Sequence, residues 1–279
     1  MDTSERQTAS IAELYLIHDG TLEVQRLRDL VHGKKLVDVE WSLRETVPPQ
    51  SRVLLFLGDE QVRDLILLAV ERQWEVGLLE HREAGRAIRT WGVSGGIEQL
   101  TRHYTKVDAI DADVLTCNDQ VVLSSVVIGE VLALEPYDAA RPPTRRSMFK
   151  AAMQAIKNLS LHSYSLIIGK EHKIRLAALG LVVMEQTQSS LVGRSFSEML
   201  SISDGRLTML LFAPRSVTAY FWFLIRLLLP GNISLSRLPA SVGLVISDRV
   251  VLESSRGLDY SLDGKPVSAK GIEFRSAEP

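Results

Sequence analysis

The sequence predicts an α/β domain built on a parallel sheet, followed by an antiparallel β-sandwich domain. Up to about residue 106, apolar runs of strand length alternate with stretches of helical spacing, as in parallel sheets wrapped by helices. Beyond that point the apolar residues fall into many short runs separated by turn residues, which is typical of a sandwich or barrel. A chain of 279 residues is long enough to bury two cores. We therefore expect one domain over residues 1–106 and a second over residues 107–279.

The first domain is expected to contain four strands connected by helices. Its clearest strand is Arg52–Leu57 (RVLLFL), a nearly continuous apolar run of the kind found in strands buried on both faces. The next segment, Val62–Arg72, has its apolar residues on one face at helical spacing and is expected to be a helix. The other strands are expected at residues 12–17, 35–39 and 75–79, and the other helices at residues 22–31 and 83–91.

The second domain is expected to be mainly β with one long helix. Strand-like runs occur within residues 107–134, and a helical stripe follows Pro142-Pro143 and extends to Leu159. Further strands are expected at residues 163–168, 174–184, 207–212, 242–246, 250–253 and 271–274.

Composition and charge exclude several classes of protein. The chain is 46% hydrophobic and 24% charged, which is ordinary for a globular protein. A formal net charge of −2 provides no polybasic field, so nucleic acid is not an expected partner. Cys117 is the single cysteine, which rules out an internal disulfide and suits a reducing compartment.

The polar residues 1–10 do not resemble a signal peptide. The most apolar segment, Val217–Leu229, contains Arg226 and is shorter than the roughly 20 residues that span a bilayer. We expect a cytoplasmic protein, with peripheral contact at a membrane surface and a homodimer both left open.

Two segments of the first domain resemble the nucleotide-binding loops of the diacylglycerol-kinase-like lipid kinases, of which NAD kinases are distant relatives. Leu55–Leu68 (LFLGDEQVRDLILL) is similar to the family's strand, G-G-D-G-T turn and helix. Gly58 and Asp59 stand at its second glycine and its aspartate, whereas the remaining turn positions depart from the pattern at Leu57, Glu60 and Gln61. Val76–Val93 aligns without a gap on the family's strand, P-x-G-T-G-N-D loop and helix, but Glu80, Arg82, Glu83, Ala84, Gly85 and Arg86 replace the loop residues.

Three turns of the second domain match the family better. Asn118–Gly129 resembles its N-G-x-x-F-L-N-V-A-S-I-G hairpin, Ser203–Leu211 its D-G-x-L-x-V strand start, and Ser261–Lys265 (SLDGK) its late L-D-G-E turn. The resemblance implies a Rossmann-like domain followed by a β-sandwich that binds the lipid or other acceptor. Asp19-Gly20-Thr21 also mimics a kinase turn, but no phosphate loop follows it at the right distance.

The resemblance also implies roles for particular residues. Gly58 and Asp59 would be the remnant of the turn that holds the phosphates of ATP and its magnesium ion, and Asp263 would be the base that accepts the proton of a lipid hydroxyl. Arg82 and Arg86 depart from the family's loop and are expected as nucleotide-binding residues only because they could offset the negative charge of the neighbouring glutamates. Asp204 would bind magnesium together with the carbonyl oxygens of Leu207 and Met209. Glycine-rich loops serve such sites because backbone N–H groups approach phosphate closely only where no Cβ intrudes.

Each of these residues also has a purely structural interpretation. Asp59 is expected as a helix N-cap, and Asp263 and Asp204 as ordinary turn residues. The six histidines show no metal-binding spacing and are expected on the surface or in the core, as is Cys117 in the core.

Three functions follow from the loops. Glu60, Glu80 and Glu83 oppose a polyanion, which favours a divergent relative with weak or no kinase activity that binds a lipid, metabolite or protein. The alternative is an active ATP-dependent lipid kinase. An NAD-kinase-like enzyme is the weakest alternative, because the N-D pair that binds its acceptor is missing.

Overall fold

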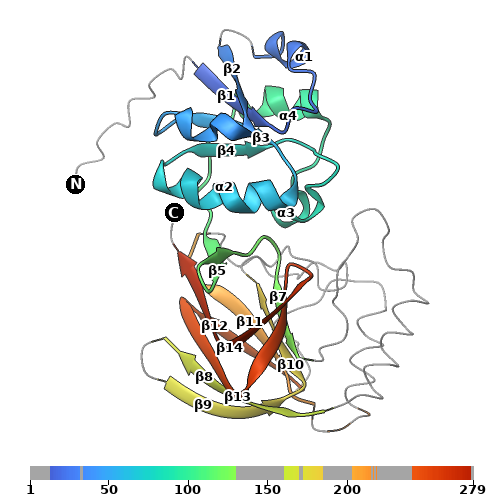
Figure 1. Cartoon of the computed structure of the whole chain (residues 1–279), viewed down its shortest axis with the longest axis vertical. Coiled ribbons are helices and arrows are strands. Elements are labelled where there is room, and N and C mark those ends of the chain that lie inside the picture. The colour runs from blue at the N-terminus through green and yellow to red at the C-terminus, as the bar shows by residue number, and fades with distance from the viewer. Residues whose placement is uncertain are drawn as a thin grey trace. The chain divides into compact units, whose positions relative to one another are not determined.

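The computed structural model describes residues 13–31, 34–129, 160–169, 172–184, 203–214, 216, 218 and 241–277. The chain divides into two compact units, Met1–Ile110 and Asp111–Pro279 (Figure 1). The apolar segment Val217–Leu229 and the helix expected after Pro142-Pro143 lie almost entirely outside the described residues. Among the residues that are described, no helix is long and apolar enough to cross a membrane.

The first unit contains a four-stranded parallel sheet in the order β2-β1-β3-β4. Its strands are β1 (Glu13–His18), β2 (Lys35–Glu40), β3 (Arg52–Phe56) and β4 (Glu75–Leu78). Its helices are α1 (Gln25–Arg28), the 3-10 helix η1 (Trp41–Thr46), α2 (Asp59–Glu71), α3 (Gly85–Thr90) and α4 (Ile97–Tyr104). The predicted parallel-sheet, Rossmann-like domain is confirmed, but the helix expected at residues 22–31 is reduced to four residues, and α4 was not predicted.

Both faces of this sheet are covered. One face joins a cluster that includes Leu14, Leu16 and Leu54 from the strands, Leu27 from α1 and Leu100 from α4. The alternate strand residues Ile17, Val53 and Leu55, which point to the other face, are no more than 1% exposed. Burial on both sides explains why β3 is almost entirely apolar.

The described residues of the second unit form a ten-stranded sheet in which all strand pairings are antiparallel. Its strands are β5 (Val114–Cys117), β6 (Gln120–Val121), β7 (Val126–Gly129), β8 (His162–Ile168), β9 (His172–Ala178), β10 (Gly180–Met184), β11 (Leu207–Phe212), β12 (Val242–Ser247), β13 (Arg249–Leu262) and β14 (Lys265–Ala277). The main path runs β12-β11-β10-β7-β13-β14-β5-β6, with the β8–β9 hairpin attached to the first half of β13.

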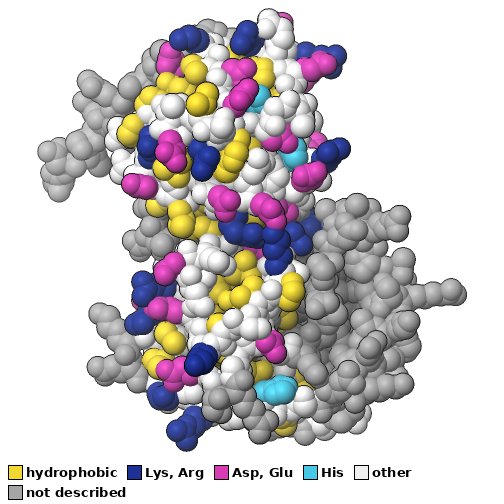
Figure 2. Space-filling model, viewed as in Figure 1, with side chains coloured by type: hydrophobic (Ala, Val, Ile, Leu, Met, Phe, Trp, Pro, Cys, Tyr) yellow, Lys and Arg dark blue, Asp and Glu magenta, His cyan; other side chains and the backbone are white. Residues whose placement is uncertain are grey.

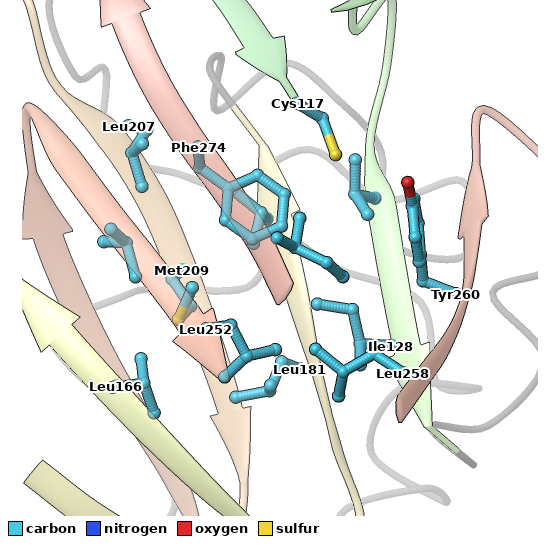
Figure 3. Close-up of a cluster of buried hydrophobic side chains, with 14 of the residues drawn as sticks. Cys117, Ile128, Leu166, Leu181, Leu207, Met209, Leu252, Leu258, Tyr260 and Phe274 are labelled. Atoms are coloured by element: carbon cyan, nitrogen blue, oxygen red, sulfur yellow. The ribbon is translucent and has the colours of Figure 1, made fainter. Parts of the chain in front are cut away.

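This sheet curls around one core. Leu207 and Met209 on β11 belong to the same buried cluster as Cys117 on β5 and Phe274 on β14, although three strands separate β11 from β14 in the sheet order (Figure 3). A flat sheet cannot bring such distant strands together, so its two halves fold over each other as in a sandwich. The predicted α/β domain followed by an antiparallel β domain is therefore confirmed.

One predicted strand was wrong. Residues 174–184 were expected to form a single strand, but the chain turns at Leu179 between β9 and β10. The backbone N–H of Leu179 donates to the carbonyl oxygen of Phe212 at 2.8 Å, so the residue is held by β11 instead of continuing β9.

Candidate functional site

The strand order of the first unit locates the expected binding crevice. Chain connections leave β1 toward β2 and then return to β3 on the other side of β1. In open α/β sheets, ligands bind outside the carboxyl ends of the strands at such a switch point. Here it is formed by the residues after β1, including Asp19, and those after β3, including Gly58 and Asp59.

Asp59 uses its side chain to cap helix α3. Its carboxylate accepts the backbone N–H of Arg86 at 3.1 Å and that of Ala87 at 3.0 Å, and the Arg86 guanidinium lies 3.6 Å away. Negative charge stabilises a helix N-terminus, where backbone N–H groups lack partners within the helix. The expectation that Asp59 is an N-cap was wrong for α2, whose N-cap is Gly58, because the carboxylate is used on α3 instead.

The backbone of the turn is also occupied. Gly58 donates its N–H to the Gln61 Oε1 at 3.3 Å, and Asp59 donates its N–H to the carbonyl oxygen of Glu83 at 3.0 Å. A Cβ added to Gly58 would lie 3.3 Å from the Glu83 Cβ and 3.6 Å from its Oε2. The Glu83 side chain therefore lies against the side of Gly58 where any other residue would carry its Cβ. The predicted contact residues Gly58, Asp59 and Arg86 are thus brought together, with Glu83 among them.

Arg82 lies at the solvent-exposed edge of this loop. Its side chain is 82% exposed, and its Nη2 is 3.5 Å from the Glu83 Oε1. In the view of Figure 2, acidic and basic side chains alternate over the surface of this unit. Such mixing agrees with the near-zero net charge of the sequence.

A buried histidine connects the loops that follow β1 and β4. The His81 Nδ1 accepts the backbone N–H of Glu83 at 3.2 Å, so the ring proton lies on Nε2, which is 3.3 Å from the Asp19 Oδ2. The His81 ring also stands edge-on to Phe56 at the end of β3, with ring centroids 4.7 Å apart. His81 thereby fixes the loop that places Glu83 over Gly58.

Asp19 is held in its charged form. Burial alone raises the pKa of this carboxyl, but hydrogen bonds from the Thr21 hydroxyl and backbone N–H, together with His81, lower it further than burial raises it. The net pKa lies below its ordinary value.

His18, at the end of β1, repeats the arrangement. Its Nδ1 accepts the backbone N–H of Gly20 at 2.9 Å, and its Nε2 is 2.6 Å from the Asp38 Oδ1 on β2. In both histidines the two ring nitrogens have partners within the protein. These residues stabilise the loops at the carboxyl edge of the sheet.

Sequence reasoning missed this network. Asp19-Gly20-Thr21 was set aside, and the histidines were assigned to the surface or core in general. Asp19 follows β1 and His81 follows β4, and the carboxyl ends of parallel strands share one edge. The placement of polar residues directly after two predicted strands was the signal that could have found the pair.

Asp263 in the second unit is buried and accepts several hydrogen bonds. Its Oδ2 accepts the Leu123 N–H at 2.9 Å, and its Oδ1 accepts the N–H groups of Ser124 at 2.7 Å and Ser125 at 3.2 Å. The Ser124 hydroxyl donates to Oδ1 as well, at 3.0 Å. A carboxylate offers about four acceptor positions, so most of this capacity is directed at the 123–125 backbone. Its role as a base stays a prediction.

The three expected magnesium ligands differ in their exposure to solvent. Asp204 is exposed, and its Oδ1 accepts the Arg206 N–H at 3.1 Å, which is an ordinary turn interaction. Leu207 and Met209 are fully buried on β11, opposite Ser247 and Val245 of β12. The described residues contain no group of three or more His, Cys, Asp or Glu side chains that could hold a metal ion. The expected magnesium site is built from one carboxylate and two backbone carbonyls, and it stays a prediction.

Cys117 is a core residue, as predicted. It is fully buried, and burial raises the pKa of its thiol to about 12. The neighbouring Tyr260 hydroxyl acts in the opposite direction on this pKa, but burial is the larger cause. The thiol therefore stays neutral near pH 7 and is a poor nucleophile.

Comparison with known proteins identifies the fold. No protein-family model matches the chain, and no curated protein matches it in sequence. Three solved structures of proteins assigned as diacylglycerol kinases from Bacillus anthracis str. Sterne do match, each over 96% of this chain and 94% of the other. Their TM-scores are 0.68, 0.63 and 0.68 at sequence identities of 15%, 12% and 12%. The two-domain resemblance predicted from the sequence is confirmed at the level of structure, and this chain has a diacylglycerol kinase-like fold.

Proposed function

We propose that this protein is a divergent relative of the diacylglycerol kinases that does not transfer phosphate and acts by binding a ligand. The observation that carries the proposal is the position of two carboxylates. Asp59 caps the N-terminus of α3, and Glu83 lies over Gly58. Both stand where the resemblance expects the phosphates of ATP.

Phosphoryl transfer depends on positioning and on neutralising charge, so free backbone N–H groups at the loop are essential. The N–H groups of Gly58 and Asp59 donate to Gln61 and Glu83. Those of Arg86 and Ala87 donate to Asp59. A triphosphate would therefore have to displace hydrogen bonds that the protein already makes within itself.

Electrostatics add to the cost of binding ATP. Two unit charges of like sign at 4 Å repel by about 1 kcal/mol in water and about 4 kcal/mol at the effective dielectric near a protein surface. The Glu83 side chain is 65% exposed, which favours the lower figure, whereas the Asp59 side chain is 11% exposed, which favours the higher. Arg82 and Arg86 offset part of this repulsion, but each already pairs with one of the carboxylates.

The ligand we propose is a lipid or another small molecule, or a protein, recognised without phosphorylation. The proteins that share the fold are named for diacylglycerol, so a diacylglycerol lipid is the first ligand to test. Contact with a membrane surface would follow from binding such a lipid.

The test combines calorimetry with an activity assay. Titration of the full chain with ATP and magnesium should show no binding up to about 1 mM, a concentration that corresponds to about −4 kcal/mol. A diacylglycerol phosphorylation assay should show no turnover. Micromolar ATP affinity with turnover that disappears in Asp263→Asn would overturn the proposal.

A matched pair of variants tests the role of the Glu83 carboxylate directly. Glu83→Gln removes the negative charge over Gly58 but keeps the side-chain volume, whereas Glu80→Gln removes a charge from an exposed residue of the same loop. We expect Glu83→Gln to raise the affinity for inorganic triphosphate more than Glu80→Gln does. Equal effects would show that the position of Glu83 is unimportant.

An active ATP-dependent lipid kinase is the second candidate, favoured by the preserved Asp263 turn of the second unit. In that case Asp263 would accept the proton of the lipid hydroxyl, and magnesium would be bound at the triphosphate and at Asp204 with the Leu207 and Met209 carbonyls. Turnover that requires both magnesium and Asp263 would support it.

A further inference from the structure

Both ring nitrogens of the buried His81 have partners. The side chain is only 3% exposed, its Nδ1 accepts the backbone N–H of Glu83 at 3.2 Å, and its Nε2 lies 3.3 Å from the Asp19 Oδ2. The carbonyl oxygen of His81 also accepts the N–H of Ala84 at 3.0 Å, which closes residues 81–84 into a turn. The turn that carries Glu83 is therefore held to the rest of the first unit through the His81 ring.

The contact at Nδ1 exists only while that nitrogen carries no proton. A neutral imidazole has one donor and one acceptor nitrogen, whereas the imidazolium has two donors. With a proton on Nδ1, two donors, the ring N–H and the Glu83 N–H, would face each other across 3.2 Å. Because histidine is the residue type that gains a proton between about pH 8 and pH 5, this contact is of a kind that mild acid breaks.

The surroundings of His81 stabilise a positive charge at one of its two nitrogens. Asp19, in the loop after β1, faces Nε2, and at the end of β3 the ring meets the uncharged Phe56. The charged residues of its own loop and of the 58–59 turn are of both signs: Glu80, Arg82, Glu83, Arg86 and Asp59. Burial opposes a charge on the ring, and the Asp19 carboxylate offsets that cost. The contact that a protonated ring has to give up is the one between Nδ1 and Glu83.

Loss of this contact would act directly on the 58–59 turn. The Glu83 carbonyl oxygen accepts the N–H of Asp59 at 3.0 Å, and the Glu83 Cβ lies 3.3 Å from the position that a Cβ on Gly58 would take. The N–H, the carbonyl group and the side chain belong to one residue, so displacing the N–H loosens the other two contacts. His81 thus connects a proton to the closure of the loop.

We propose that protonation of His81 releases Glu83 from Gly58 and opens the loop to a triphosphate in mild acid. The inference rests on the proposed function, in which the loop is closed to phosphate at neutral pH. In acid the Asp59 N–H becomes available, the Glu83 carboxylate no longer lies against Gly58, and the imidazolium adds a positive charge. By linkage, binding of the anion then takes up a proton.

Amide hydrogen exchange of the full chain, followed by NMR, measures the release. The protection factor of the Glu83 amide should fall by about 10-fold between about pH 8 and pH 5.5, as expected for the loss of one hydrogen bond. In His81→Asn, whose Oδ1 can accept the same N–H but takes up no proton, it should stay constant. His103→Asn is the matched control, because His103 is an exposed histidine of the same unit and its replacement should leave the fall unchanged. A constant protection factor in the natural sequence, or an equal fall in a His81→Asn variant that thermal unfolding shows to be folded, overturns the proposal.

Binding of inorganic triphosphate at constant ionic strength tests the consequence. The gain in affinity from about pH 8 to pH 5.5 should be at least about 10-fold larger in the natural sequence than in His81→Asn, a comparison that removes the protonation of triphosphate itself. Micromolar binding already at pH 8 would contradict the proposed function, and with it the closed loop at neutral pH. Weak binding at pH 8 with equal gains in the two proteins would overturn the proton-driven opening alone.

Discussion

Two aspartates, one in each unit, use their carboxylates in the same way. Asp59 accepts two backbone N–H groups at the start of α3, and Asp263 accepts three from residues 123–125 together with the Ser124 hydroxyl. They differ in setting, because Asp59 has an arginine beside it, whereas Asp263 is 2% exposed in a turn with φ 49°.

The comparison shows that an aspartate in a family motif can have a structural role that does not require catalysis. Each residue sits at the position that the resemblance assigns to phosphate transfer, and each satisfies backbone donors that would otherwise be unpaired. A buried unsatisfied donor costs about 1–3 kcal/mol, which is enough to keep an aspartate at these positions. The aspartates alone therefore do not indicate phosphate transfer. The loops around them are more informative, and in the first unit the carboxylates of Asp59 and Glu83 occupy the loop.

The largest loss of stability is expected at Gly129 in the second unit, where the surrounding atoms leave no room for a side chain. Gly129 ends β7, the strand that follows the turn held by Asp263, and has φ 75°. A Cβ there would lie 2.6 Å from the Leu179 carbonyl oxygen and 2.6 Å from the Tyr164 hydroxyl. Gly129→Ala should lower the free energy of unfolding by at least about 3 kcal/mol, measured by urea denaturation.

Gly58→Ala is the matched change in the first unit. Gly58 has φ −74°, which any residue adopts, and an added Cβ would lie 3.3 Å from the Glu83 Cβ, a tight contact but much longer than those at Gly129. The loss should stay below about 1 kcal/mol. Equal losses for the two glycines would show that the 58–59 turn is as rigid as the core of the second unit.

Asp263→Ala should be the next most damaging change. It leaves the N–H groups of Leu123, Ser124 and Ser125 without their acceptor, and we expect a loss of about 3 kcal/mol. Asp263→Asn keeps one acceptor oxygen and should cost about half as much. Thermal and urea denaturation without any nucleotide provide the measurement, and an unchanged stability would mean that the aspartate is kept for a reason other than structure.

Asp59→Ala should cost less. The α3 helix has only six residues and loses one cap and a partly exposed ion pair, so about 1 kcal/mol is expected. Hydrogen exchange should show the loss confined to residues near Arg86 and Ala87. If unfolding of the whole unit accelerates equally, Asp59 contributes to the core and not only to the cap.

Much of the fold could be predicted because it depends on local patterns. The apolar run at Arg52–Leu57 closely matches β3, since burial on both faces leaves no other composition for such a strand. The helix expected at residues 22–31 is shorter because Leu27 and Leu30 donate to carbonyls three residues back, in tight turns instead of α-helix. Helix α4 was missed although Ile97, Leu100 and Tyr104 have helical spacing.

The site was harder to predict because it depends on strand order. The contact between Asp19 and His81 exists only because β1 and β4 lie on either side of β3 in one parallel sheet. Nothing in the local sequence of either residue specifies that order. The position of Glu83 over Gly58 has the same origin, since the two residues follow β4 and β3. The gapless alignment with the family predicted where the loop lies in the sequence. The position of its Glu83 side chain over Gly58 could be seen only in the folded structure.

The smallest expected effect is on the stability of the protein in acid. It depends on Asp19 in the first unit and should not be reproduced by a change in the second unit. The folded pKa of Asp19 lies below its ordinary value of 3.8, so the unfolded chain binds a proton more readily there than the folded chain does. Its contribution is fully present above that value and is lost as the pH falls through the lower folded pKa. Because the hydrogen bonds from Thr21 and the pair with His81 favour the ionised over the protonated carboxyl, Asp19→Asn should flatten the decline in unfolding free energy as the pH falls below about 4. The difference should be about 1 kcal/mol at most, because burial of the Asp19 carboxyl opposes the stabilisation that Thr21 and His81 provide. Urea denaturation across this range, with Asp248→Asn in the second unit as a control for general charge, provides the measurement. Parallel curves for Asp19→Asn and the natural sequence would mean that the loop after β1 is already released in acid before Asp19 is protonated.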